Sequence, residues 1–154
     1  MKKAHIWVCI WLVIIAAPVL IIMATYEKKG MGPRLDIVKV GVILPLTGPL
    51  SNLGEDIKNG LELLPKRPLT LDGGPSIVYI YEDSAGDPKT ALQAANKFLN
   101  AGDVSAVITG PGSSANMAIA PLFQKAGIPF ISISATPGLA DAGDFVFRLL
   151  PDIS

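Results

Sequence analysis

Apolar residues form two kinds of run along the chain, which differ in length and in spacing. The first run, Ile6–Ala24, is almost wholly apolar and contains no charged residue. About 20 apolar residues suffice to span the hydrocarbon core of a bilayer. After it, short apolar runs alternate with stretches in which apolar residues recur at helical spacing. This pattern predicts a hydrophobic N-terminal helix followed by a separate α/β domain.

Residues 1–25 have the features of an export or membrane-insertion signal. A short basic start, Met1–Lys3, precedes the apolar run, as in secretory signals. A cleaved signal ends in a small–x–small site, whereas Ile22–Ala24 has a bulky residue at one of the two positions. We therefore expect residues 1–25 to be an uncleaved signal-anchor, with a cleaved signal peptide as the alternative. Residues 26–36 are polar and contain glycine and proline, which predicts a linker.

Five short runs rich in apolar and β-branched residues predict buried strands. These runs are Ile37–Leu44, Ile77–Tyr81, Val104–Ile108, Ile128–Ile133 and Phe145–Leu149. Between them, helical spacing predicts three helices, around Ile57–Leu64, Ala91–Leu99 and Met117–Ala126. Strands that alternate with helices of this length form βαβ units. Residues 37–154 are therefore expected to form an α/β domain with a parallel sheet of about five strands.

Single residues mark several of the predicted helix ends. Asp87 followed by Pro88 favours a helix start, because aspartate caps the first turn and proline suits the first position. Gly102 favours a helix end, because glycine readily adopts the left-handed conformation found there. Pro121 falls inside the third helix, where proline costs about 3 kcal/mol or more, so a kink or local unwinding is expected.

The composition excludes several classes of function. Thirteen basic and thirteen acidic residues cancel and form no basic stripe, which argues against nucleic-acid binding. The one histidine, His5, and the one cysteine, Cys9, both lie in the N-terminal segment. Residues 37–154 therefore contain neither a Ser-His-Asp triad nor a histidine-based zinc site, and the chain has no intrachain disulfide.

Two loops that follow neighbouring predicted strands carry the remaining candidate chemistry. Gly110–Ser114 connects a strand to a helix, and we expect Ser113 or Ser114 to be the N-cap. A helix start offers unpaired N–H groups and the positive end of the peptide dipoles, which suits a carboxylate or a phosphate. The loop Ser132–Gly138 repeats the pattern of small hydroxyl residues after the next strand. In an open α/β sheet such adjacent loops form one ligand crevice.

Other interpretations of these motifs fit less of the sequence. Gly110-x-Gly112-x-x-Ala115 matches a dinucleotide fingerprint, but Ser132–Ser134 stand where the acidic residue is expected. The glycines are not followed by Lys-Ser/Thr, which excludes a P-loop. The acidic loop 82–87 lacks calcium-loop spacing, so we expect no metal site, and we expect no cofactor. The remaining alternative is structural, in which Ser113 and Ser114 only cap a helix.

Several longer phrases resemble, in their order and spacing, the branched-chain amino-acid-binding (Leu/Ile/Val-binding) family of type I periplasmic binding proteins. The resemblance runs from about Val38 to the end of the chain. The phrases are Val40–Pro49, Leu53–Gly60, Tyr81–Asp83 with Asp87–Pro88, Gly110–Ser114, Pro129–Pro137 and Phe145–Arg148. Proline in the third helix also occurs often in that family.

The resemblance implies a fold of two lobes, of which residues 37–154 supply the N-terminal part of the first. In that family, the α-carboxylate of an amino-acid-like ligand binds at the loops of this lobe. By position, Ser113 would offer its hydroxyl, and Ala135 and Thr136 would offer backbone and hydroxyl groups, with Ser114 as a secondary candidate. Leu53 matches a position that often faces the ligand side chain.

The resemblance further implies a binding protein without enzymatic activity, for amino acids or related small carboxylates or amides. Such a protein would serve ABC-type uptake or sensing, with a transporter permease or a sensor as its partner. It would act in the periplasm, tethered to the inner membrane by residues 6–24 or exported after signal cleavage. Because the sequence lacks the second lobe, the expectation is a truncated receptor.

Overall fold

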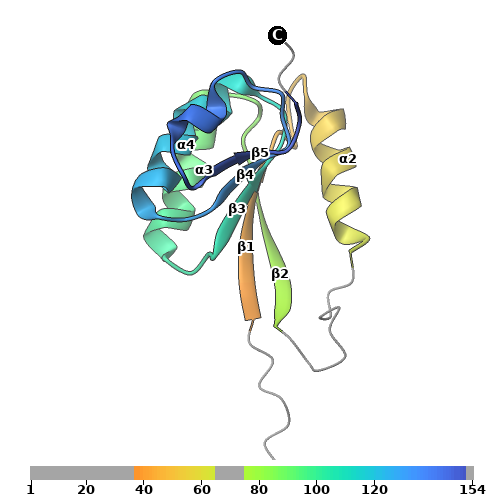
Figure 1. The fold of residues 1–154 in the computed structure, drawn as a ribbon. Coiled ribbons are helices and arrows are strands. Elements are labelled where there is room, and N and C mark those ends of the chain that lie inside the picture. The colour runs from red at the N-terminus through yellow and green to blue at the C-terminus, as the bar shows by residue number, and fades with distance from the viewer. Residues whose placement is uncertain (1–36, 65–74, 152–154) are drawn as a thin grey trace, which may run out of the picture. The chain divides into compact units, whose positions relative to one another are not determined.

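The computed structural model describes residues 37–64 and 75–151, which belong to one compact unit (Figure 1). The expected signal-anchor, residues 1–25, and the expected linker, residues 26–36, lie outside the described residues. Within the described ranges, no helix combines the length and the apolar character needed to cross a membrane.

The centre of the unit is a five-stranded sheet in which all neighbouring strands run parallel. The strands are β1 (Ile37–Leu44), β2 (Ser76–Asp83), β3 (Ala106–Thr109), β4 (Phe130–Ser132) and β5 (Val146–Arg148). Their order across the sheet is β2-β1-β3-β4-β5. The predicted α/β fold with a parallel sheet is therefore confirmed. In this order the chain changes direction across the sheet between β1 and β3, and ligands of open sheets bind beside such a switch point.

Helices cover both faces of the sheet (Figure 1). α2 (Ser51–Glu62) lies on one face, whereas α3 (Pro88–Ala101) and α4 (Ser113–Ala126) lie together on the other. A short 3-10 helix, η1 (Leu139–Ala142), follows β4. The hydrophobic pattern does not predict η1, because four residues are too few to show a helical period.

The larger apolar cluster lies between the sheet and the layer formed by α3 and α4. The predicted inner face of α3 is buried at Ala91, Ala94, Ala95 and Phe98, while Leu99 is half-buried. Gly41 of β1 is required by this packing, because a Cβ atom there would lie 2.9 Å from the ring of Phe98. The close fit between β1 and α3 therefore leaves no room for a side chain at that position.

A smaller apolar cluster joins the other face of the sheet to α2. It contains Val40, Val42 and Leu44 of β1, with Ile57 and Leu61 of α2 packed against them. Alternate residues of β1 thus point to α2, as expected for a strand that is covered on both faces. The predicted helical spacing of Ile57 and Leu61 agrees with this contact.

Helix α3 has the predicted ends. The Asp87 carboxylate accepts a hydrogen bond from the Thr90 N–H at 2.9 Å, and Pro88 is the first helical residue. Gly102 ends the helix in the left-handed conformation, with φ of 64°. These features were predictable because each depends on a local pattern of two to four residues.

Helix α4 corrects two expectations. Its N-cap is Gly112, so the prediction that Ser113 or Ser114 caps it is wrong. The helix also runs through Pro121 to Ala126, so the local unwinding expected as one alternative is absent, while the kink expected as the other stays a prediction. Packing explains the second difference, because Phe123, two residues after the proline, is fully buried in the larger cluster.

Candidate functional site

The two candidate loops lie side by side at the carboxyl ends of β3 and β4. These strands are paired in parallel, with Thr109 opposite Ser132 in the last paired position. The loop that begins at Gly110 and the loop that begins at Ile133 therefore leave the sheet at the same edge. The Ile133 N–H also donates to the Thr109 carbonyl at 2.8 Å, which joins the loop starts.

Four hydroxyl side chains form a continuous chain across these loops, which we call the hydroxyl ladder: Ser132, Ser134, Thr136 and Ser113. The Oγ atoms of Ser132 and Ser134 are 2.7 Å apart, and Ser134 Oγ is 2.8 Å from Thr136 Oγ1. Thr136 Oγ1 donates to Ser113 Oγ at 3.3 Å. The first three residues are buried, with exposed fractions of 0%, 5% and 1%, whereas Ser113 is exposed. The ladder therefore leads from the core to the surface.

Asn116 fixes the inner end of the ladder. Its side-chain Nδ2 donates to the Gly110 carbonyl at 2.8 Å and lies 3.2 Å from both Ser132 Oγ and Ser134 Oγ. Asn116 is buried in the first turns of α4, so one side chain joins the glycine loop, the helix start and the loop after β4. Asn116 was not among the site residues predicted from the sequence. The available signal was an amide on the apolar face of a helix, because a buried amide needs hydrogen-bond partners.

The backbone at the start of α4 depends on glycine. Gly112 has φ of 125°, a conformation that residues with a Cβ rarely adopt, and its carbonyl accepts the Asn116 N–H at 2.9 Å. The helix start carries no side-chain cap. The Ser113 hydroxyl is therefore part of the ladder instead of a cap, which contradicts the structural interpretation that Ser113 only caps the helix.

The other candidate residues surround this point without belonging to the ladder. Ser114 is exposed on the first turn of α4, and Ala135 is half-buried between the ladder residues Ser134 and Thr136. Leu53, on the first turn of α2, has 51% of its surface exposed. The glycine loop approaches α2, because a Cβ atom at Gly110 would lie 3.2 Å from Ile57 Cδ1. All the candidates thus lie at one end of the sheet.

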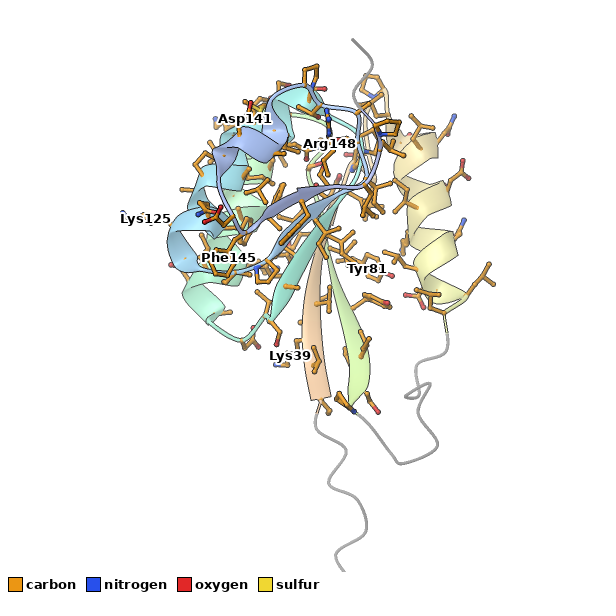
Figure 2. All side chains as sticks on the ribbon, viewed as in Figure 1. Lys39, Tyr81, Lys125, Asp141, Phe145 and Arg148 are labelled. Carbon is orange, nitrogen blue, oxygen red and sulfur yellow. The ribbon has the colours of Figure 1, made fainter. Side chains whose placement is uncertain are left out.

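A positive charge adjoins the loop after β4. The Arg148 guanidinium, at the end of β5, donates to the Thr136 carbonyl at 3.1 Å. Figure 2 shows Arg148 at the end of the sheet where these loops lie, whereas Lys39 lies toward the other end. Arg148 was not among the site residues predicted from the sequence. Its charge favours an anionic group near the outer end of the ladder.

The acidic segment 82–87 has a structural role through Asp83, which is the last residue of β2 because the strand extends two residues beyond its predicted end. The Asp83 carboxylate accepts hydrogen bonds from the N–H groups of Leu46 and Ala85 at 2.8 Å and from the Thr47 hydroxyl at 2.6 Å. Burial would raise the pKa of Asp83, but these hydrogen bonds outweigh that effect and hold the pKa below its usual range. Among the described residues, acidic, histidine and cysteine side chains form no group of three that could hold a metal ion.

Comparison with known proteins identifies the class to which this fold belongs. A model of the family described as periplasmic binding protein matches residues 37–153. The chain belongs to this family, which confirms the resemblance seen in the sequence. A Leu/Ile/Val-binding protein of Rhizobium johnstonii is 31% identical over 110 residues, which cover 69% of this chain and 29% of the relative.

Solved structures lead to the same class. A leucine binding protein of Thermotoga maritima has a TM-score of 0.65 at 26% identity, and the match covers 75% of this chain and 33% of that one. A solute binding protein of an ABC transporter from R. palustris, in complex with 4-hydroxybenzoate, has a TM-score of 0.63 at 26% identity, covering 73% and 31%. The chain therefore spans about a third of the length of these relatives. Their names describe binding proteins, in agreement with the expectation of a protein without enzymatic activity.

Proposed function

We propose that residues 37–154 contribute to the ligand-binding lobe of an extracytoplasmic solute-binding protein. Its ligand would be an amino acid or a related small carboxylate or amide. The observation that carries this proposal is the hydroxyl ladder, which ends at the exposed Ser113 hydroxyl beside the N-terminus of α4. Hydroxyl and N–H groups at a helix start are well suited to bind a carboxylate.

Each candidate residue has a distinct part in the proposed site. The Ser113 hydroxyl donates to a carboxylate oxygen, and the backbone of Ala135 and Thr136 lines the other side of the same group. Ser114 adds a second hydroxyl on the exposed first turn of α4. Leu53, half exposed on α2, contacts the apolar part of the ligand.

The relatives support a carboxylate as the shared feature of the ligand. One similar structure is called a leucine binding protein, and another is a complex with 4-hydroxybenzoate. Leucine and 4-hydroxybenzoate differ in size, shape and in the amino group, but both carry a carboxylate. We therefore assign the carboxylate to the loops of this chain and leave the remainder of the ligand open.

The family and the N-terminal sequence support a proposal for the cellular role. Solute-binding proteins of this kind act outside the cytoplasm, and the R. palustris relative is described as part of an ABC transporter. We propose that this chain serves ABC-type uptake or sensing, with a permease or a sensor protein as its partner. We further propose that residues 6–24 tether it to the inner membrane, with cleavage of that segment as the alternative.

Thermal unfolding with added ligands tests the proposed binding site. A ligand that binds only the folded state raises the unfolding free energy by about 2.7 kcal/mol at a concentration 100 times its Kd. We expect L-leucine, other L-amino acids or 4-hydroxybenzoate to raise the midpoint of the 154-residue chain. Ser113→Ala should abolish that increase, because it removes the outer hydroxyl of the ladder.

The matched control is Ser105→Ala, since Ser105 is exposed and lies immediately before β3, at the end of the strand opposite to the site. This control should keep the full response to the ligand. A midpoint that responds to NAD or NADP and to none of the carboxylates would contradict the proposal and favour the dinucleotide alternative.

A further inference from the structure

Each hydroxyl of the ladder has a single proton to donate, and this determines the direction of every hydrogen bond in it. Thr136 Oγ1 donates its proton to Ser113 Oγ. The 2.8 Å contact between Ser134 and Thr136 therefore needs Ser134 as its donor. By the same argument, the 2.7 Å contact between Ser132 and Ser134 needs Ser132 as its donor. All three contacts are hydrogen bonds only when the protons point outward, from Ser132 toward Ser113.

Asn116 determines this direction from the inner end. The Gly110 carbonyl can only accept, so the amide NH2 of Asn116 must face it. One amide proton binds Gly110, and the other is shared between the Oγ atoms of Ser132 and Ser134, each 3.2 Å away. An amide NH2 has no acceptor lone pair. The inner serines therefore cannot donate toward Asn116, and their protons point along the ladder.

At the outer end of the ladder, the Ser113 hydroxyl keeps one proton that no ladder residue accepts. Ser113 Oγ accepts the proton of Thr136, so the proton of Ser113 itself is directed to the exposed side. We infer that Asn116 is a positioning residue that orders the hydroxyl protons and makes Ser113 a donor toward the ligand; this inference rests on the proposed function. The free proton of Ser113 then favours an acceptor group of the ligand, such as a carboxylate or a carbonyl, over an ammonium group, which has only the remaining lone pair of Ser113 Oγ to bind.

Asn116→Asp tests the positioning role, because it keeps the shape of the side chain and replaces the donor by an acceptor. The ladder protons should then point inward, so that Ser113 donates to Thr136 and presents only acceptor lone pairs to the ligand. The probes are 4-methylpentanoate and its neutral amide, 4-methylpentanamide, titrated into the isotope-labelled 154-residue chain in detergent and followed by NMR. We expect the affinity ratio of carboxylate to amide to fall at least tenfold. A loop that is merely loosened would weaken both probes equally. Repulsion by the new charge alone would lower the ratio in Asn116→Asp but not in the uncharged variant Ser134→Ala, so a fall confined to Asn116→Asp would overturn the positioning role.

The matched control is Asn96→Asp on α3. The Nδ2 atom of Asn96 also donates to a backbone carbonyl, that of Leu92 at 2.8 Å, but Asn96 is exposed and lies outside the ladder. Its substitution introduces the same charge and should leave the ratio of the two affinities within twofold of the wild-type value.

Ser134→Ala interrupts the ladder without adding a charge, and so remains informative if Asn116→Asp does not fold. It should lower the ratio of carboxylate to amide affinity three- to tenfold, because Thr136 loses the donor that orients it. Ser84→Ala is the matched control, since Ser84 is also buried and its Oγ accepts a hydrogen bond, from the Gly86 N–H at 3.3 Å. That variant should keep the wild-type ratio.

The hydroxyl protons can also be located without any ligand. In the wild-type chain we expect a nuclear Overhauser contact between the Thr136 hydroxyl proton and the β protons of Ser113. We also expect slow exchange with water for the three buried hydroxyl protons. A Ser113 hydroxyl proton found on the bond to Thr136 would overturn the proton order, whatever the binding data are.

The two proposals fail in different ways. If the wild-type chain binds carboxylates and both Asn116→Asp and Ser134→Ala keep its ratio of affinities, the positioning role is overturned and the proposed function stands. A wild-type chain that prefers 3-methylbutylamine to 4-methylpentanoate overturns the donor role of Ser113. If the wild-type chain binds neither probe nor L-leucine, the proposed function and the ligand preference fall together, and the NMR proton positions still decide the proton order.

Discussion

At the scale of single residues, the buried polar side chains near the ends of β3 and β4 differ in whether they have hydrogen-bond partners. Asn116 and the three buried hydroxyls of the ladder are all hydrogen-bonded. Thr109, the last residue of β3, is 1% exposed, and the described residues supply no partner for its Oγ1 atom. A buried polar group without a partner costs about 1–3 kcal/mol.

Thr109→Val should therefore leave the unfolding free energy unchanged or raise it by about 1 kcal/mol, because valine has the same shape without the unpaired hydroxyl. Thr136→Val is the matched control, since Thr136 is equally buried but both accepts and donates in the ladder. It should lower the unfolding free energy by about 1–3 kcal/mol. Urea denaturation of both variants measures the two values. A loss of more than 1 kcal/mol in Thr109→Val would show that its hydroxyl has a partner.

The separation of the site residues along the sequence explains why the site was only partly predictable. Asp87 and Gly102 were predicted because a cap depends on residues three or four positions away. Ser113 was identified as a site residue, but its neighbour in the ladder, Thr136, is 23 positions away in the sequence. Contact between them requires β3 and β4 to be paired, and no local pattern contains that information. Asn116 carried a local signal, an amide on the apolar face of a helix, but its partners Ser132 and Ser134 lie 16 and 18 positions away, so the signal did not show what the amide binds.

At the scale of elements, Asp83 joins the loop after β1 to the end of β2. Its carboxylate accepts from the N–H of Leu46 and from both the N–H and the hydroxyl of Thr47. These contacts hold the chain between β1 and α2 in place, and α2 carries Leu53 of the proposed site. The acidic segment that was considered for a metal ion thus helps to position α2.

Asp83→Asn should lower the unfolding free energy by about 1–2 kcal/mol at neutral pH, because the new NH2 cannot accept a hydrogen bond from Thr47. The pKa of Asp83 is lowered in the folded state, so this carboxylate stabilises the fold at pH values above its unfolded pKa. That contribution is lost as the pH falls through the folded pKa. The difference in unfolding free energy between wild type and variant should therefore be constant from about pH 5 to about pH 7. It should shrink below about pH 4.

Chemical denaturation at several pH values measures this difference. Asp56→Asn is the matched control, since Asp56 is an exposed carboxylate on α2. Its unfolding free energy should stay within about 0.5 kcal/mol of the wild-type value. A difference between wild type and Asp83→Asn that persists unchanged at low pH would mean that the charge of Asp83 is not responsible.

Among the elements, the strands and the long helices were predictable, because each has enough residues to show a period of two or 3.6. β1 has the predicted bounds, Ile37–Leu44. The fourth strand is shorter than predicted, at Phe130–Ser132, because Ile133 already belongs to the loop that carries the ladder. Apolar composition alone does not distinguish the last residue of a strand from the first residue of such a loop.

At the scale of the whole molecule, the order of the strands brings the site together. β3 lies between β1 and β4, so the loops after these three strands leave the sheet next to each other. The sequence predicted parallel strands but not their order, since several orders satisfy the same βαβ pattern. The pattern had placed the two hydroxyl loops in one crevice, and the family resemblance then named Ser113 and Thr136 within them, before the contact between the two side chains was known.

The proposed membrane tether is also a property of the whole molecule, and cell fractionation tests it. Residues 6–24 carry no charge over a length that can span a bilayer, so an uncleaved chain should sediment with the inner membrane. It should resist an alkaline wash and dissolve in detergent, with an intact mass of at least 16.2 kDa. Deletion of residues 6–24 is the matched variant, and it should abolish membrane association while the ligand response of the folded lobe remains. A soluble periplasmic form with a mass reduced by the N-terminal segment would instead establish cleavage and exclude the tether.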